Sequence, residues 1–256
     1  ACGNCDLTGG FLTVLSGFNN DIDAASSHSF IGSGLNNTIH GFSDSLGTTV
    51  DDANVIGSGN GNTIYGGYNI ISSGQNNSIG QSTDSAAVTH SHIAGGALNR
   101  VYSSFSTLGS LYNSISETNK YQTISGGGNH HVYGEHATIG GGYQNTISTG
   151  TRNIIAGGSH NSIDSNYSHY AFVSGYQNRV SGATNYSGIV GGSTNYISAS
   201  YASVNGGSGV NVGVGDHYNI VTGGENVTIN GAFNWVMATN LNLASSNSFF
   251  WGHYPT

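Results

Sequence analysis

His90 and His92, separated by one serine, are the side chains in this sequence best placed to hold a metal ion together. In an extended strand, residues two apart point to the same face, so both imidazoles should leave the strand on one side. Imidazole nitrogens bind transition metals such as zinc, copper and nickel. Two imidazoles are only a partial ligand set, so a complete site depends on what this strand face meets.

Cys2 and Cys5 are the only two cysteines and form a CxxC pair near the first residue. This spacing is compatible with a short disulfide, or with a pair that crosses to a neighbouring chain, in an extracellular protein. A zinc site would need ligands from elsewhere in the sequence. A thioredoxin-type redox motif would need a βαβ setting, which the sequence lacks. We therefore expect a disulfide rather than redox catalysis.

The carboxylates give little support for catalysis. The glutamates are Glu117, Glu135 and Glu225, and the aspartates fall mostly in expected loops. Glycoside hydrolysis needs two carboxylates roughly 5–10 Å apart across a groove, and no such pair is recognisable. The sequence therefore favours a protein that is not an enzyme and has no bound cofactor.

The composition favours an ordered, repetitive β structure. Gly accounts for 42 of 256 residues and charged residues for 6%, against about 7% and 25% in typical soluble domains. The 15 tyrosines and the regularly placed Ile and Val distinguish the chain from a disordered one. A net charge of −8 with four basic residues argues against a nucleic-acid partner. No apolar run approaches the ~20 residues of a membrane span.

A phrase of the form apolar-x-x-Gly-x-x-Asn-x-Ile recurs along the chain, as in IGGGYQNTI followed by IAGGSHNSI. Taking the first apolar residue as position zero, the phrase has Gly at +3, Asn at +6 and Ile or Val at +8. Position zero is occupied by Val14, Ile31, Ile56, Ile71, Ile93, Thr107, Ile124, Ile139, Ile155, Phe172, Ile189, Val204 and Val221. This regularity indicates thirteen copies of one structural unit.

The residue types of the phrase predict a thin β-solenoid. Ile and Val at position zero and +8 suit short strands with one buried side. Gly at +3 permits a positive φ or a close approach at a first corner. Asn at +6 suits a second corner through the left-handed region, and stacked coils would align its carboxamides into a ladder. Most repeats are 14 to 17 residues apart, too short for a strand and a helix.

Aromatic rings and histidines recur three residues before position zero. We expect this stripe on the strand face opposite the buried Ile, either as a stacked ladder or chain–chain seam, or as a platform for sugar rings. Its members are Phe11, His28, Ala53, Tyr68, His90, Ser104, Tyr121, His136, Arg152, His169, Tyr186, Tyr201 and Tyr218.

The sequence divides into an expected N-terminal cap at 1–13, a repeat domain at 14–230, and a C-terminal cap or chain junction at 231–256. The repeat lengthens near 40–55 and 80–92, where loops should emerge on one face. Acidic residues gather in these insertions, at Asp44, Asp51, Asp52 and Asp84. A calcium site there would need a spaced oxygen-ligand loop, which is not visible, so solvated loop acids are the simpler expectation.

The phrases GGGYQNTIS, AGGSHNSI and VGGSTNYIS resemble the left-handed β-roll repeats in head domains of trimeric autotransporter adhesins, and are similar to Gly/Asn repeats of phage and other viral fibres. The resemblance covers roughly residues 14–229. It implies a parallel homotrimer, displayed outside a cell or on a virion and used for attachment. The closing SNSFFWGHYPT resembles a Phe-Trp-Gly segment near the end of many viral fibre shafts. With no adhesin-type neck, stalk or membrane anchor visible, the viral-fibre form is favoured.

The resemblance also gives the histidine pair a setting, because three copies of His90 and His92 near a common axis would offer six nitrogens to one octahedral transition metal. The function we expect is attachment to a host-surface glycan or protein receptor, strengthened by multivalency. The candidate contacts are Tyr68, Tyr121, Tyr186, Tyr201, Tyr218, Asp44, Asp51 and Asp52.

Two alternatives remain open at this stage. The chain is a passive shaft that only positions another part, or it is an ice-binding solenoid with a flat threonine array. At position +7, where such an array would lie, the sequence also places Arg100, Arg179 and Tyr196, which would break the plane.

Overall fold

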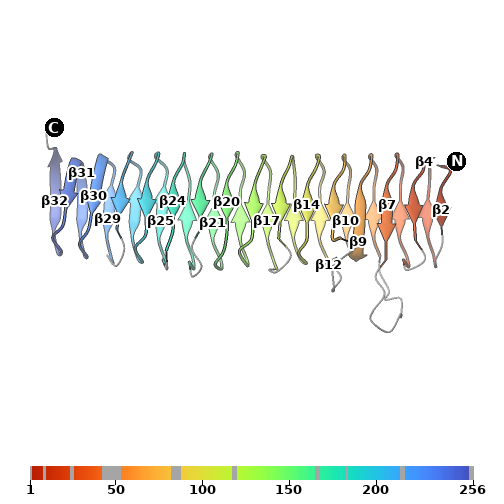
Figure 1. Ribbon diagram of the computed structural model, residues 1–256, viewed down its shortest axis with the longest axis horizontal. Coiled ribbons are helices and arrows are strands. Elements are labelled where there is room, and N and C mark those ends of the chain that lie inside the picture. Colours follow the sequence, from red (N-terminus) through yellow and green to blue (C-terminus); the bar gives the residue numbers. More distant parts are fainter. Residues whose placement is uncertain are drawn as a thin grey trace. The chain divides into compact units, whose positions relative to one another are not determined.

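The chain folds as a parallel β-solenoid of about 14 turns. The structure, a computed structural model, describes residues 2–7, 10–23, 26–41, 53–81, 88–116, 120–164, 168–182, 184–213 and 217–253. It comprises two compact units, Ala1–Asn129 and His130–Thr256. Among the described residues there is no helix, and so none that could cross a membrane. Figure 1 shows the short strands of each unit following one another in chain order.

Most strands of the first unit are two residues long and pair with strands of the next coil. They are β1 (Cys2–Gly3), β2 (Asp6–Leu7), β3 (Thr13–Val14), β4 (Gly17–Phe18), β5 (Asp21–Ile22), β6 (Phe30–Ile31), β7 (Thr38–His40), β8 (Val55–Ile56), β9 (Thr63–Gly67), β10 (Ile70–Ile71), β11 (Ser78–Ile79), β12 (Val88–Thr89), β13 (His92–Ile93), β14 (Arg100–Val101), β15 (Thr107–Leu108), β16 (Ser114–Ile115) and β17 (Thr123–Ile124).

The second unit has the same pattern and ends in three longer strands. Its strands are β18 (His131–Val132), β19 (Thr138–Ile139), β20 (Thr146–Ile147), β21 (Ile154–Ile155), β22 (Ser162–Ile163), β23 (Phe172–Val173), β24 (Arg179–Val180), β25 (Gly188–Val190), β26 (Tyr196–Ile197), β27 (Ser203–Asn205), β28 (Asn211–Val212), β29 (Ile220–Thr222), β30 (Glu225–Ile229), β31 (Trp235–Leu243) and β32 (Phe249–His253).

Most strands of each unit form two stacks, one before the glycine corner and one after the asparagine corner, while β1 pairs with β4 and β12 with the end of β9. In the first stack, β10 pairs with β8 and β13, which aligns Ile71 with Ile56 and Ile93. In the second stack, β11 pairs in the same way with β9 and β14. All pairings are parallel, as expected for coils that repeat one path. In the interior coils the residues that the two stacks point inward, such as Ile71 and Ile79, have no exposed surface, so the core is two rows of Ile, Val and Leu.

The buried residue of the first stack differs from the sequence prediction in two coils. Leu108 aligns with Ile93 and Ile124, and Val173 aligns with Ile155 and Ile189. Thr107 and Phe172, to which position zero was assigned, point outward instead. In both coils, one residue rather than two separates the buried residue from the corner. The residue three positions before the corner, which the sequence pattern assigns to the core, is therefore an outward-facing residue in these two coils.

The glycine corner is confirmed, and its physical reason is visible. Gly59 has φ +122°, and a Cβ there would lie 2.1 Å from the carbonyl oxygen of Gly74 in the next coil. The left-handed region and the close approach therefore both exclude a side chain. Ser110 is the residue that occupies this corner without being glycine, at φ 82°.

The asparagine corner was predicted one residue out of place. The left-handed residue is at +5, as at Asn36 with φ 53°, and the +6 asparagine Asn37 is buried instead. The buried asparagines do form the expected carboxamide ladder. Nδ2 of Asn37 donates to Oδ1 of Asn20 at 3.0 Å, and Nδ2 of Asn62 donates to Oδ1 of Asn37 at 3.1 Å. These side chains supply hydrogen bonds to backbone groups that face inward at the corner.

Candidate binding surface

The aromatic stripe lies at a corner and not on a strand face. Tyr186, Tyr201 and Tyr218 have φ of 53°, 56° and 58°, so each occupies the left-handed region just before a first-stack strand. The stripe also has different members in two coils. Phe105 and Tyr170 occupy the positions assigned to Ser104 and His169. In these two coils the buried first-stack residue lies one position later than predicted, and the ring three residues before it shifts by the same amount.

In the first unit the stripe is a run of four stacked rings. Tyr68 stacks on His90 with ring centroids 5.1 Å apart, His90 on Phe105 at 5.0 Å, and Phe105 on Tyr121 at 5.1 Å. Farther towards the N-terminus, Phe11 and His28 stack at 5.0 Å. The spacing is close to the ~4.8 Å distance between neighbouring strands. We call these rings, with those of the second unit, the ring ladder.

In the second unit the ring ladder has five consecutive rings. Tyr170, Tyr186, Tyr201, Tyr218 and Phe233 follow one another with centroid distances of 4.9 to 5.3 Å and interplanar angles of 6 to 16°. The guanidinium of Arg152 lies over the ring of Tyr170, 5.5 Å from its centroid. The four tyrosines are each about half exposed.

Stacking explains why bulky residues tolerate this backbone. A non-glycine residue in the left-handed region costs about 1–2 kcal/mol. An aromatic pair contributes about 0.5–1.5 kcal/mol beyond its buried area, and each interior ring belongs to two pairs. The two effects are of similar size, so the ladder compensates for the strain of the corner that positions it.

The ladder restricts what a ligand can touch. Both faces of Tyr186, Tyr201 and Tyr218 are covered by neighbouring rings about 5 Å away, which leaves no room for a sugar ring between them. The exposed parts of these side chains are therefore ring edges and phenol hydroxyls. Such a surface can donate and accept hydrogen bonds at one position per coil.

The histidine pair is divided between two surfaces. His90 is held in the ring ladder, whereas His92 projects from strand β13, where its Nε2 lies 2.9 Å from the hydroxyl oxygen of Ser72. Within the described part of the chain, no three His, Cys, Asp or Glu side chains are grouped as metal ligands. A metal shared between several copies of the chain stays a prediction.

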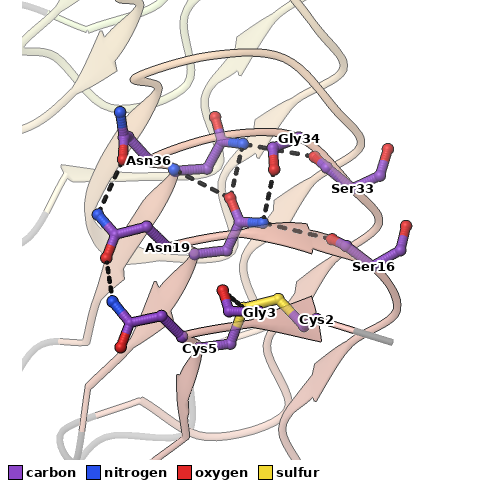
Figure 2. The surroundings of a disulfide bond; sticks show 11 residues. Cys2, Gly3, Cys5, Ser16, Asn19, Ser33, Gly34 and Asn36 are labelled. Carbon is purple, nitrogen blue, oxygen red and sulfur yellow. Dashed lines mark hydrogen bonds between the residues drawn. A yellow bond between two sulfur atoms is a disulfide. The ribbon is translucent and has the colours of Figure 1, made fainter.

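A disulfide joins Cys2 and Cys5 within the chain, beside the first coils of the first unit (Figure 2). Next to it, exposed asparagine carboxamides line up along the coils. Nδ2 of Asn4 donates to Oδ1 of Asn19, and Nδ2 of Asn19 donates to Oδ1 of Asn36, both at 2.8 Å. With Asp6 and Asp21, these side chains border an open polar hollow of about 490 Å³.

Two aspartates at this end repel one another. Asp6 and Asp21 are directly aligned on neighbouring parallel strands. Partial burial raises the pKa of the Asp21 carboxyl, and the charge of Asp6 raises it further. Asp23 lies close by, with its Oδ2 atom 2.9 Å from Nδ1 of His40. Asp44, Asp51, Asp52 and Asp84, the acids of the expected insertions, lie outside the described residues.

One surface carries no charged residue and was not anticipated from the sequence. It consists of the outward residues of the first-stack strands, and we call it the neutral face. In the first unit these are Thr13, Phe30, Val55, Ile70, His92, Thr107 and Thr123, followed by a second row of Leu15, Gly32, Gly57, Ser72, Ala94, Gly109 and Ser125. In the second unit they are Thr138, Ile154, Phe172, Gly188, Ser203, Ile220, Trp235 and Phe249, with Gly140, Ala156, Ser174, Val190, Asn205, Thr222, Met237 and Trp251.

The neutral face of the second unit ends in an aromatic cluster. Trp235 aligns with Phe249, and Met237 with Trp251, on the adjacent strands β31 and β32. With Phe250 they border an apolar hollow of about 210 Å³. Phe249 is 68% and Trp251 78% exposed. The signal available in the sequence was the absence of Asp, Glu, Lys and Arg one residue before and one after each inward residue of the first stack, rather than the presence of a residue type.

The sequence matches no protein-family model and no curated protein.

Proposed function

We propose that this protein is a non-enzymatic attachment domain that acts as a parallel homotrimer on a cell or virion surface and binds a host glycan or protein receptor. The observation that carries the proposal is the five-ring ladder of the second unit. It repeats an exposed side chain once per coil on a backbone held by hydrogen bonds to both neighbouring coils. A regular row of identical weak contacts is suited to multivalent binding.

The geometry favours ligand contacts through ring edges and hydroxyls. The interior rings of the ladder already have both faces covered, so stacking of sugar rings on them is disfavoured. Hydroxyl groups from Tyr186, Tyr201 and Tyr218 instead present donors and acceptors at a spacing of about one coil. The receptor should therefore offer repeated polar groups, as a glycan chain or a glycan-rich surface does.

A glycan array and whole-cell binding, both performed with the native assembly, test this function. A variant with Tyr186→Asn and Tyr201→Asn removes two rings but keeps a residue that tolerates the corner, as Asn247 does at φ 58° in the same row. We expect binding to fall at least tenfold. The matched control is Tyr176→Asn, which removes a tyrosine of similar exposure outside the ladder.

Retention of full binding by the double variant would remove the ladder from the site. Absence of binding to any glycan or cell at high valency would favour the alternative, a passive shaft that positions another part of the assembly.

Ice binding has weaker support, because the second stack does not present a flat threonine row. Arg179 aligns with Ser162 and Tyr196 there, and forms an ion pair with Asp164 at 2.6 Å. A positive thermal-hysteresis measurement would nevertheless replace the attachment proposal.

A further inference from the structure

The neutral face of the second unit is the surface on which another molecule can pack at the lowest electrostatic cost. The chain carries a net charge of −8, so two copies repel one another when charged surfaces approach. The outward rows of the first-stack strands contain no Asp, Glu, Lys or Arg. The second stack, by contrast, presents the ion pair of Arg179 and Asp164.

Several large apolar side chains on this face have more than half of their surface exposed. Val190 is 53% exposed and Trp235 also 53%, and both lie in the same two rows as Phe249 and Trp251. The rows converge on the apolar hollow beside Met237. The apolar side chains are contiguous around Trp235, Phe249 and Trp251, and a contiguous apolar patch on a protein surface marks a contact site.

The periodicity of the face indicates which partner fits it. Its side chains recur once per coil, because Phe172, Gly188 and Ser203 are aligned by parallel pairing. A partner must present groups with the same rise to stay in register over several coils. A second copy of this chain, laid parallel, has that rise by construction and carries the same uncharged rows.

We propose that copies of this chain associate through the neutral face of the second unit, in parallel register, with the cluster of Trp235, Phe249 and Trp251 forming the contact between copies at one end. The inference rests on the homotrimer of the proposed function and assigns the surface that makes it. In this register Val190 of one copy lies at the height of Val190 of the next. The ring ladder borders the interface and keeps its exposed edges for other contacts.

A charge placed in the middle of the face tests the interface. We expect light scattering to give an assembly mass for the unaltered chain and the mass of a single chain for Val190→Asp, with the far-ultraviolet β signal retained. Trp251→Ser is a second disruptive variant and should shift dissociation to at least tenfold higher protein concentration. Tyr176→Asp is the matched control, because it adds the same charge at an exposed position outside the face and should leave the mass unchanged.

Mixing chains separates loss of the interface from misfolding. Val190→Asp and Val190→Lys chains should each be single, and should assemble when combined, because a mixed trimer replaces two of the three like-charge pairs at this height with opposite-charge pairs. An unaltered assembly mass in both Val190→Asp and Trp251→Ser would overturn the proposed face. A single-chain mass for the unaltered protein would overturn self-association itself. Glycan and cell binding is measured on the same samples. Binding by an assembly whose mass Val190→Asp and Trp251→Ser leave unaltered would overturn the interface alone, whereas an assembly that Val190→Asp dissociates but that binds no glycan or cell would overturn the attachment function alone.

Discussion

Asn37 and Asn62 occupy equivalent positions in neighbouring coils, and Oδ1 of Asn37 accepts two hydrogen bonds from Asn62. The backbone N–H and the Nδ2 group of Asn62 both donate to it, each at 3.1 Å. Nδ2 of Asn62 also donates to the carbonyl oxygen of Gly74 in the following coil at 2.9 Å. One buried carboxamide therefore ties three successive coils together.

Replacing Asn62 should destabilise the first unit strongly. Asn62→Ala leaves the backbone N–H of Asn77 and the carbonyl of Ser58 without their side-chain partner, at about 1–3 kcal/mol for each buried group. We expect the free energy of unfolding to fall by about 2–5 kcal/mol in urea denaturation at fixed protein concentration.

Asn62→Asp should lower the free energy of unfolding further at neutral pH, since it places a carboxylate against carbonyl oxygens. It should recover part of the loss below about pH 4, where the carboxyl is protonated. Equal stability of Asn62→Ala and the unaltered protein would contradict the role of the ladder.

Ser110→Gly should stabilise the protein. Ser110 adopts φ 82° at a corner where the equivalent residues are glycine, and relief of such strain is worth about 1 kcal/mol. The midpoint of urea denaturation should rise. Gly59→Ala is the opposite test, because its Cβ would meet the carbonyl oxygen of Gly74, and it should prevent normal folding of the coil. A lower midpoint for Ser110→Gly would show that the serine side chain is needed there.

The corrected register predicts that alanine substitutions at two adjacent residues lower the free energy of unfolding by unequal amounts. Leu108 is fully buried, whereas Thr107 is exposed. Leu108→Ala should cost about 2–5 kcal/mol through loss of burial and the cavity left behind. Thr107→Ala should change the free energy of unfolding by no more than about 0.5 kcal/mol. The reverse order would restore the original assignment of Thr107 to the core.

The aspartate pair predicts a pH dependence of stability. Because the pKa of Asp21 is raised in the folded state above its ordinary value of 3.8, the folded protein binds this proton more tightly than the unfolded chain. The contribution of Asp21 to stability therefore falls as pH rises through the window just above 3.8. Asp21→Asn should remove that slope and modestly raise the melting temperature at neutral pH. Thermal unfolding from pH 3 to 7 measures both effects; an unchanged slope in Asp21→Asn would assign it to other groups.

The sequence predicts the fold well because the features that define a coil are local. Ile, Gly and Asn at fixed spacing follow from two strands with one buried residue each, one tight corner and one buried carboxamide. The register failed at Leu108 and Val173, where a one-residue shortening of the coil left the apolar pattern readable in two ways. The left-handed corner was assigned to Asn37 rather than Asn36 because both are asparagines and only the backbone distinguishes them.

The candidate surfaces were less predictable. The ring ladder was visible as a periodicity, but its position at a corner depends on φ values that Tyr201 or Phe105 would not suggest, since bulky residues rarely adopt them. The neutral face consists of unlike residues such as Phe172, Gly188 and Ser203. What they share is only the absence of charge, which becomes a pattern once the strands are aligned.

The direction of the carboxamide ladder has a consequence for synthesis. Each buried asparagine in the first unit, from Asn20 to Asn99, offers its Oδ1 to the backbone of the coil that comes later in the chain. A ribosome delivers the earlier coil first, so each of these Oδ1 acceptors is already in place when the backbone N–H that donates to it emerges. Because partners are separated by only one coil of sequence, closing each contact requires a short search. The protein can thus grow as it is translated, with each finished coil serving as the template for the next.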